Sequence, residues 1–415
     1  MTNKPAQVLI VGAGIGGLTL ALQLHAAGVP ARLLETATRL RPLGVGINIL
    51  PHASRELHRL GLADDLARTA VRPRESVFYN RFGQFIYAEP LGAAAGYTWP
   101  QYSIHRGDLQ MIFVDAVRQR LGEDAISLDH TFRRFTQDPD GVTAVVEHSG
   151  SELEIRADVL VGCDGVHSAV RRQLHPGEEG LLYSGYTMWR GATRYTPILT
   201  GASMIRAGWL ATGKMVVYPI RDDIDGQGRQ LINWVAELKT PQRGDRDWNR
   251  DGRIEDVIAP FAEWRFDWLD VPELIRSAEQ ILEYPMVDQD PLDRWSFGRV
   301  TLLGDAAHPM VPRGSNGGGQ AILDTRALTD ALSDHADPVS ALREYEQRRR
   351  TATAQVVRLN RTNPPDAILR EVYERTGDQP FARIEDVISI EELEAMLQHY
   401  RHAAGYSHEA LSATP

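Results

Sequence analysis

Cysteine is nearly absent from this sequence. Its 415 residues include one cysteine, Cys163, which excludes an internal disulfide framework, a dithiol redox pair and a cysteine-rich metal site. Long apolar runs are also lacking, since no stretch approaches the roughly 18 consecutive apolar residues of a membrane-spanning helix. The segment Met1 to Gln7 has neither the basic flank nor the cleavage pattern of a targeting signal. We therefore expect a cytoplasmic protein without a membrane span.

Positive charge is in deficit. Lys and Arg total 45 against 55 Asp and Glu, which gives a formal net charge of −10 at pH 7. Nonspecific nucleic-acid binding depends largely on clustered cations, so we expect no nucleic-acid partner. Hydrophobic residues at 43%, charged residues at 24% and the lack of a biased tract indicate a globular protein rather than a disordered or fibrous one. The length predicts two joined domains or one large α/β unit.

The glycines near the N-terminus form the first strong pattern. Residues 8–35 predict a strand, a glycine turn, a helix and a second strand, which is a βαβ unit. Gly12, Gly14 and Gly17 occupy G-x-G-x-x-G positions, so the backbone can approach a pyrophosphate at the start of the helix. Glu35 stands 18 residues after Gly17, where an acid accepts hydrogen bonds from an adenosine ribose. The unit predicts a bound dinucleotide without distinguishing NAD from FAD.

Two aspartates each follow a short apolar run later in the chain. An acid directly after a buried parallel strand lies at the carboxyl edge of the sheet, where ligands of open α/β folds bind. For Asp164, a role as a cap or turn residue is an equally good interpretation. For Asp305, the glycines of 314–319 and the helix predicted over 321–332 favour ligand binding, because a second helix N-terminus can face the cofactor.

The segment from Tyr183 to Asp270 has a different character. It alternates like β-strands and contains six of the 8 tryptophans, which favours an aromatic sheet core, with a sheet that covers a flat ring as the alternative. Arg190 and Lys214 are its candidate anion-binding cations, although either also fits a structural or solvated cation. Nucleotide-domain sequence lies on both sides, so we expect an inserted domain. The six residues are Trp189, Trp209, Trp234, Trp248, Trp264 and Trp268.

These features together resemble a known family. Their order along the chain is that of single-component FAD-dependent aromatic hydroxylases, the group A flavoprotein monooxygenases. The sequence most resembles the phenazine hydroxylase type (5-methylphenazine-1-carboxylate 1-monooxygenase) and, more distantly, salicylate hydroxylases. The similarity spans roughly residues 8–359. It rests on the glycine turn with Glu35, Arg106 before a helix predicted over 107–121, Asp164-Gly165, Gly304-Asp305 followed by Pro312, and the segments RPLGVGIN, PQYSIHRGDLQMI, TMWRG, DWNRDGRIEDV and YPMVDQDPL.

The resemblance implies a Rossmann-like FAD-binding domain and an inserted mixed β-sheet substrate domain. We expect an α/β fold of these two domains with a C-terminal helical segment that lies outside the resemblance, in a monomer or homodimer. The expected boundaries are 1–75, 101–182 and 283–362 for the FAD-binding domain, 76–100 and 183–282 for the substrate domain, and 363–415 for the tail.

The resemblance also assigns residues to a noncovalently bound FAD. Glu35 would hold the ribose, Arg106 the pyrophosphate region and Asp305 the ribityl chain, while Val45 and Gly46 would flank the isoalloxazine ring. Arg313 departs from the less polar residue expected there, which bears on the flavin's electrostatics or the substrate's charge. The remaining expected FAD contacts are Gly12, Gly14, Ile15, Gly16, Gly17, Asp164, Gly304, Pro312, Gly314, Ser315, Asn316, Gly317 and Gly318.

The implied activity is hydroxylation of an acidic aromatic or N-heteroaromatic small molecule. NADH or NADPH would reduce FAD, and O2 would then form a flavin hydroperoxide, whose electrophilic distal oxygen an electron-rich ring would attack in a dry pocket. Decarboxylation stays open, as do a flavin oxidase or reductase on the same fold and a nonenzymatic flavoprotein. No metal site is expected. Candidate substrate contacts are Trp189, Arg190, Lys214, Tyr218 and Pro312, with Arg190 and Lys214 also the candidates for a catalytic role.

Overall fold

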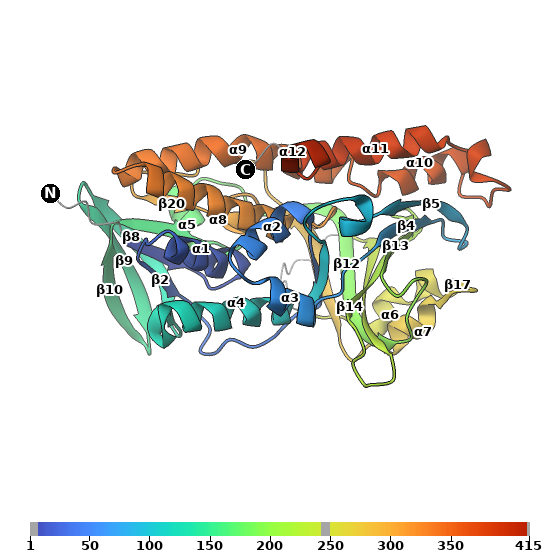
Figure 1. The fold of residues 1–415 in the computed structure, drawn as a ribbon, viewed down its shortest axis with the longest axis horizontal. Coiled ribbons are helices and arrows are strands. Elements are labelled where there is room, and N and C mark those ends of the chain that lie inside the picture. The colour runs from blue at the N-terminus through green and yellow to red at the C-terminus, as the bar shows by residue number, and fades with distance from the viewer. Residues whose placement is uncertain (1–6, 242–249, 413–415) are drawn as a thin grey trace.

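The computed structural model describes residues 7–241 and 250–412 and is built around two main sheets (Figure 1). The first is a five-stranded parallel sheet. Its central strand, β1, is buried at all four positions, because helices and a second sheet cover it and a parallel sheet needs apolar cover on both faces. Its order is β20 (Val300–Leu302), β11 (Val159–Gly162), β1 (Val8–Val11), β2 (Ala31–Leu34) and β7 (Ile126–Ser127).

Helices and a small antiparallel sheet surround this parallel sheet. Helix α1 packs against both α4 and α8, and α8 packs in turn against α9, while β9 contacts β11. The elements are α1 (Ile15–Ala26), α2 (Pro51–Arg59), α3 (Ala63–Thr69), α4 (Arg106–Leu121), α5 (Ala169–Leu174), α8 (Gly317–Asp334), α9 (Pro338–Thr362), β8 (Thr131–Asp138), β9 (Gly141–His148) and β10 (Ser151–Ala157).

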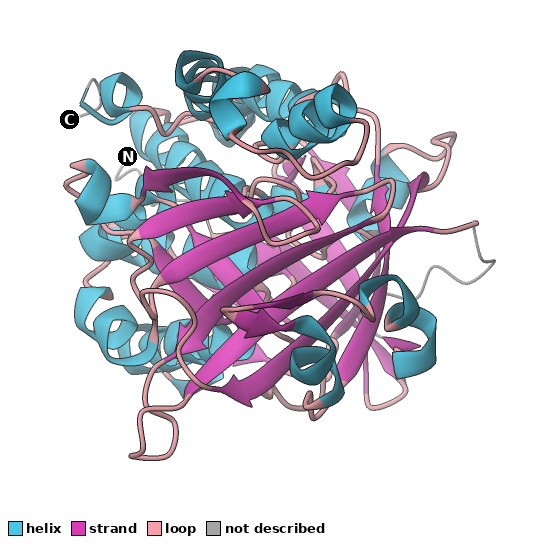
Figure 2. Ribbon diagram, turned by 90° about the vertical axis from the view of Figure 1, so that its right-hand side faces the viewer, coloured by secondary structure: helices cyan, strands magenta, loops and turns pink. Residues whose placement is uncertain are grey.

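The second main sheet has eight strands and is seen across its breadth in Figure 2. Strands β13 and β4 pair in parallel and the other neighbours are antiparallel, so the expected mixed sheet is confirmed. Its order is β16 (Arg250–Asp251), β19 (Ile281–Asp288), β12 (Leu182–Tyr195), β15 (Gln230–Lys239), β14 (Gly213–Arg221), β13 (Ser203–Trp209), β4 (Glu75–Tyr79) and β5 (Phe85–Pro90).

Strand β19 changes the proposed domain division at one point. It pairs with β12 from Leu182↔Asp288 to Gly191↔Ile281, so a boundary at 283 would cut a strand of the substrate sheet. The chain has to cross this sheet once more before it returns to β20 in the parallel sheet. We therefore propose that the substrate domain extends to residue 288 and keep the other boundaries as proposed.

Smaller elements complete the two domains. Strands β3 (Gly46–Ile49) and β6 (Tyr102–His105) form a ribbon that joins the parallel sheet's helices to the large sheet. A short cluster lies on the other face of the large sheet and contains α6 (Ile254–Val257), α7 (Val271–Arg276), β17 (Arg265–Phe266) and β18 (Leu269–Asp270).

The tail is helical, as expected. It comprises α10 (Ala367–Thr376), α11 (Ile390–Ala403) and α12 (His408–Ser412), which run beside α9 and across β13, β4 and β5 (Figure 1). Arg81 pairs with Asp378 at 2.8 Å, and the Gln84 side-chain amide donates to the Phe381 carbonyl at 2.7 Å. The tail is thus fixed to the substrate sheet as well as to α9. None of the described helices is long and apolar enough to cross a membrane.

Candidate active site

The turn between β1 and α1 leaves space in front of a helix N-terminus. Gly12 has φ +103°, and a Cβ there would lie 2.5 Å from the Cys163 carbonyl oxygen, while a Cβ on Gly17 would collide with the Gly12 carbonyl. A Cβ on Gly14 would meet nothing within 4 Å. Gly14 is also the N-cap of α1 and supplies no side-chain cap, so the first amides of the helix stay available to an anion.

The other predicted glycines bring four segments together beside this turn. A Cβ on Gly16 would lie 2.9 Å from the Leu303 side chain at the end of β20. A Cβ on Gly318 would lie 3.1 Å from Ile47 and 3.9 Å from Ile15. The starts of α1 and α8 therefore meet at the carboxyl edge of the parallel sheet, as the sequence predicted.

Glu35 ends β2 beside the same turn. One carboxylate oxygen accepts the Ala13 amide at 2.9 Å and the other accepts the Ala37 amide at 2.9 Å. Each carboxylate oxygen has a second lone pair and can still accept a hydrogen bond from a ribose hydroxyl. Glu35 thus holds the shape of the turn as well as facing the space for a ligand.

Arg106 and Asp305 are the unpaired charges of this edge. Both side chains are exposed, and no donor or acceptor of the described residues lies within hydrogen-bonding distance of either. Enough protein surrounds the Asp305 carboxyl that partial loss of hydration raises its pKa, which the charges of His308 and Arg106 oppose. A free cation and a free carboxylate beside available backbone amides fit a dinucleotide's pyrophosphate and hydroxyl groups.

Asp164 differs from Asp305. Its carboxylate accepts the Ser168 hydroxyl at 2.5 Å and the Ala169 and Val170 amides at 2.7 and 3.2 Å, so it caps α5. Burial raises its pKa, and these hydrogen bonds lower it in part. Of the two roles predicted for Asp164, the structure shows the capping one.

The Val45–Gly46 turn is fastened to the large sheet. The Gly46 amide donates to the Asn233 side-chain oxygen at 2.7 Å, and the Gly46 carbonyl accepts a hydrogen bond from the Arg190 guanidinium. A Cβ on Gly46 would lie 2.7 Å from the Asn233 side chain, so only glycine permits this approach. The segment expected to flank the flavin ring is thereby held by the substrate sheet.

The segment 312–318, whose last two residues begin α8, is held by the tail. No local sequence pattern predicts this contact. Gly314 and Ser315 have φ of +80° and +58°. The Asn316 amide group donates to the Tyr400 hydroxyl at 2.9 Å, and Tyr400 donates to the Asn360 side-chain oxygen at 2.7 Å. Tyr400 comes from α11, more than 80 residues away, so no local pattern marks the contact. Pro312 is exposed within this loop.

Asp324 is a second residue that sequence reasoning missed. It is buried in α8 and accepts hydrogen bonds from His308 at 2.5 Å, Arg349 at 2.7 Å and the Gly304 amide at 3.2 Å. Burial alone would raise its pKa, but the charges of His308 and Arg349 bring the pKa below the usual value. Asp324 therefore supports the Gly304–Asp305 turn from below. The buried face of α8 also contains Gln320, Thr325 and Thr329, so no sequence pattern singles out Asp324.

The strand β12 divides the predicted substrate residues between two faces. Arg190 lies opposite Val235, and Val216 and Tyr218 of β14 share this face, which contacts Gly46. Trp189 points the other way because successive residues of a strand alternate, and it is only 1% exposed among Phe261 and Trp264. Trp189 is therefore a packing residue, and its assignment as a substrate contact was wrong.

The other described tryptophans of this segment also serve packing. Trp234 and Trp264 are buried in the same cluster as Trp189, and Trp268 packs against it. Trp209 packs against the tail helices. Trp248 lies outside the described residues. The aromatic core interpretation is the one that the structure shows.

Lys214 is fully committed to carboxylates. Its side chain is 1% exposed, and its ammonium pairs with Glu237 at 2.6 Å and with Asp366 at the start of α10. Arg206 pairs with the other oxygen of Asp366 at 2.9 Å, and Arg313 approaches Glu237 at 3.4 Å. Burial would raise the pKa of Asp366, and the charges of Lys214 and Arg206 lower it. The predictions of Lys214 as a substrate cation and as a solvated residue were both wrong.

The half-buried Arg190 and the buried Arg313 keep unpaired donors. The Nε of Arg190 and one terminal nitrogen of Arg313 are buried and have no hydrogen-bond partner. Arg190 lies 5.9 Å from the Tyr284 ring and Arg313 lies 5.2 Å from the Tyr186 ring. Both tyrosines pack on one apolar cluster, which we call the sheet-face cluster, formed by Met188, Val216, Val235, Met286 and Val311.

Comparison with known proteins also indicates a dinucleotide-binding protein. Residues 5–360 match the family described as FAD binding domain. The chain belongs to this family. It is 43% identical over 395 residues to the phenazine 1,6-dicarboxylic acid hydroxylase PhzS of Lysobacter antibioticus, an alignment that covers 94% of this chain and 97% of the relative. The resemblance to phenazine hydroxylases of the group A monooxygenases is confirmed, and the protein is an FAD-dependent monooxygenase.

A further relative supports the same placement, and a solved structure shows the same fold. The chain is 36% identical over 367 residues to 3-amino-4-hydroxybenzoate 2-monooxygenase PtnB3 of Streptomyces platensis, which covers 87% of this chain and 88% of the relative. A salicylate hydroxylase in complex with its substrate has the same fold, with a TM-score of 0.75 and 22% identity over 99% of this chain and 97% of that one. The expected α/β fold with its mixed sheet is confirmed.

Proposed function

We propose that this monooxygenase uses NADH or NADPH and O2 to hydroxylate a planar, acidic N-heteroaromatic or aromatic molecule. The observation that carries the proposal is that Arg190 and Arg313, which flank the sheet-face cluster, each keep a buried nitrogen without a hydrogen-bond partner. A buried donor without a partner costs about 1–3 kcal/mol, so each favours a ligand that supplies an acceptor. The relative at 43% identity is named as a hydroxylase of phenazine 1,6-dicarboxylic acid, which supports this substrate class.

The charges around Arg313 also favour an anion. Lys214, Arg206 and Arg313 face the two carboxylates of Glu237 and Asp366, which leaves one positive charge in excess within this buried group. An uncompensated buried cation is costly, and a carboxylate or phenolate on the substrate would balance it. Arg313, which the sequence marked as unusual, thus joins Arg190 as a proposed substrate residue.

The proposed FAD site follows from the free groups at the edge of the parallel sheet. The amides at the start of α1 and Arg106 would hold the pyrophosphate, Glu35 the ribose and Asp305 the ribityl chain. The Val45–Gly46 turn and the 312–318 loop would lie on either side of the flavin ring. When bound, FAD supplies the oxygen activation that the side chains themselves cannot provide.

The side chains of the substrate sheet position the ring. Arg190 and Arg313 would fix the acid groups, and Met188, Val216 and Val235 would exclude water beside the ring. Burial raises the pKa of Tyr218, which Arg190 and Asn48 lower in part. Tyr218 therefore keeps its proton at neutral pH and acts as a hydrogen-bond donor to the substrate rather than as a base.

Oxygen labelling tests the proposal. Purified protein with FAD should oxidise NADH or NADPH faster when phenazine carboxylic acids, hydroxybenzoates or hydroxynicotinates are added. One oxygen atom from 18O2 should appear in the product. A product mass that is lower by one CO2 would reveal decarboxylation. A flavin oxidase or reductase would consume the donor without labelling an aromatic product, and a nonenzymatic flavoprotein would show no ligand-stimulated reduction. We further propose a cytoplasmic location and a monomer or homodimer.

A further inference from the structure

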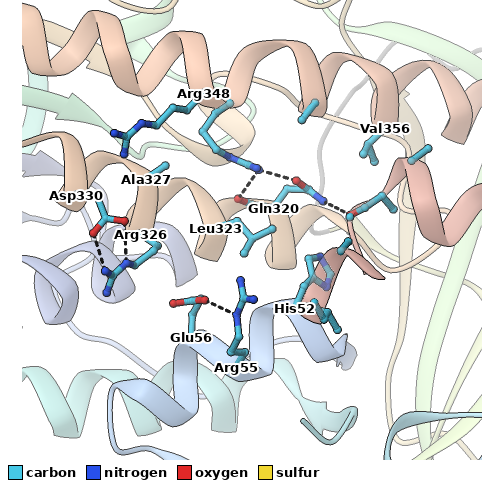
Figure 3. A pocket seen from close by; sticks show the side chains of 17 residues that line it. His52, Arg55, Glu56, Gln320, Leu323, Arg326, Ala327, Asp330, Arg348 and Val356 are labelled. Carbon is cyan, nitrogen blue, oxygen red and sulfur yellow. Dashed lines mark hydrogen bonds and ion pairs between the residues drawn. The ribbon is translucent and has the colours of Figure 1, made fainter. Parts of the chain in front are cut away.

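A cavity apart from the candidate active site is lined by α2, α8, α9 and the C-terminal helices (Figure 3). Its volume is about 370 Å³, which lies in the range of small-molecule pockets. We call it the α2–α8 cavity. His52 of α2 connects it to the candidate active site, because a Cβ on Gly319, in the first turn of α8, would lie 3.4 Å from the His52 ring. Nothing in the proposed hydroxylation uses this cavity.

Two buried side chains that line the cavity keep polar atoms without a hydrogen-bond partner in the described protein. His52 is 1% exposed, and neither of its ring nitrogens is hydrogen-bonded. Burial, with the charges of Arg349 and Arg55, lowers the pKa of His52 to about 3, so the ring is neutral and carries one N–H. Arg55 donates from Nε to Glu56 at 2.8 Å, while its Nη1 is buried without a partner. Figure 3 shows the Arg55 guanidinium reaching from α2 toward Leu323 of α8.

The other charged side chains of the cavity are already paired. Arg349 donates to Asp324 at 2.7 Å and to Gln320 at 2.6 Å. Arg326 pairs with Asp330 and Arg348 with Glu344, and both point away from the cavity (Figure 3). The remaining wall is largely apolar. It includes Leu323, Ala327, Ala352, Val356, Ala403 and Leu411.

We propose that the α2–α8 cavity binds a small organic carboxylate, with its acid group on Arg55 and His52 and its apolar body against Leu323 and Ala327. A guanidinium N–H and a neutral imidazole N–H match the two oxygens of one carboxylate. A phosphate dianion needs more donors, and the buried Glu56 beside Arg55 opposes a second negative charge. The ligand would contact α8 directly behind the turn that begins at Gly317, so the site is separate from the substrate site.

The test uses 4-bromobenzoate and the FAD-loaded protein. In crystals soaked with this acid, anomalous scattering should place a bromine in the α2–α8 cavity, whereas 4-bromobenzyl alcohol and inorganic phosphate should leave the cavity without it. In solution, calorimetry with Arg190→Met protein, whose substrate site is weakened, should show binding of 4-bromobenzoate. Adding Arg55→Met should weaken this binding about 10-fold or more. Ala327→Phe, which fills the cavity and touches no charge, should abolish it.

Arg326→Met provides the matched control, because Arg326 borders the cavity but pairs outward with Asp330. Its affinity for 4-bromobenzoate should equal that of the parent protein. A bromine found solely beside the sheet-face cluster, or an affinity that neither Arg55→Met nor Ala327→Phe changes, would overturn the proposal. Binding of 4-bromobenzyl alcohol in the cavity with the same affinity as 4-bromobenzoate would also overturn the proposal, since the acid group would then contribute nothing. These outcomes do not depend on whether the protein hydroxylates an aromatic acid.

Discussion

At the scale of single residues, Arg190 and Arg313 share one proposed task but differ in their other contacts. Changing either to methionine should weaken the binding of an acidic substrate about 10- to 150-fold, since a hydrogen bond to a charged group contributes about 1.5–3 kcal/mol. Arg190→Met should also weaken FAD binding, because the Gly46 carbonyl loses its hydrogen-bond donor. Titration of the flavin absorbance with substrate gives the first quantity and ultrafiltration of free FAD the second.

The exposed Arg276 on α7, across the sheet, is the control for this pair. Arg276→Met should bind substrate and FAD like the parent protein. If Arg190→Met and Arg313→Met both retain the parent substrate affinity, the anion is held elsewhere and the substrate class has to be reconsidered.

The two aspartates that follow β11 and β20 provide a second prediction at this scale. Asp305→Ala should reduce FAD occupancy and leave the stability of the FAD-free protein nearly unchanged, because no described protein group is bonded to the carboxylate. Asp164→Ala should instead lower the free energy of unfolding by about 0.5–2 kcal/mol through loss of the α5 cap. Urea denaturation of the FAD-free variants and flavin-to-protein absorbance ratios separate the two effects. The opposite pattern would exchange their roles.

At the scale of elements, the tail helix α11 fixes the loop that precedes α8. Tyr400→Phe would leave the Asn316 amide and the Asn360 oxygen without this partner inside the protein. We expect a loss of about 1–3 kcal/mol in the free energy of unfolding. We also expect weaker FAD binding and more hydrogen peroxide per NAD(P)H consumed, because the loop at 312–318 is less well held. Denaturation, flavin titration and peroxide assays measure these effects.

Tyr373 of α10 provides the control substitution for Tyr400→Phe. Its hydroxyl makes no hydrogen bond among the described residues, so Tyr373→Phe should leave stability and coupling unchanged. Normal peroxide release from Tyr400→Phe, together with reduced stability, would assign Tyr400 to tail packing alone.

Elements with local patterns were predictable from sequence, and contacts between distant elements were not. The βαβ unit of β1, α1 and β2, the helix α4 and the start of α8 follow from glycine placement and periodicity within short windows. Alternation along β12 puts Arg190 and Trp189 on opposite faces, but the face that meets the Gly46 turn depends on a contact between residues 144 positions apart. The pairing of Lys214 with Asp366 joins residues 152 positions apart and leaves no local trace.

At the scale of the whole molecule, the buried charges join three parts of the chain. Lys214 and Glu237 come from the substrate sheet, Arg313 from the flavin loop and Asp366 from the tail. Because desolvation offsets much of the attraction within a buried ion pair, such a group defines geometry more than it adds stability. We infer that this group of buried charges holds the flavin loop and the tail in one position relative to the sheet.

His52 makes the stability of the whole protein depend on pH. Its pKa is about 3 in the folded protein and about 6.5 in the unfolded chain, so between these values the unfolded state binds the extra proton. Stability contributed by the neutral ring is present above pH 6.5 and declines as the pH falls, by about 1.4 kcal/mol per pH unit. From pH 7 to pH 5, we expect His52 to account for a loss of about 2 kcal/mol in the free energy of unfolding. Urea denaturation at both pH values measures the loss.

The variant His52→Gln isolates this contribution, because glutamine does not titrate and other histidines act equally in both proteins. The difference in unfolding free energy between pH 7 and pH 5 should be about 2 kcal/mol smaller in the variant than in the parent protein. His25→Gln, a change at an exposed residue of α1, should reproduce the parent's pH dependence. Equal pH dependence in His52→Gln and the parent would mean that His52 accepts a proton in the folded protein, which requires water or an acidic group to reach the buried His52 ring.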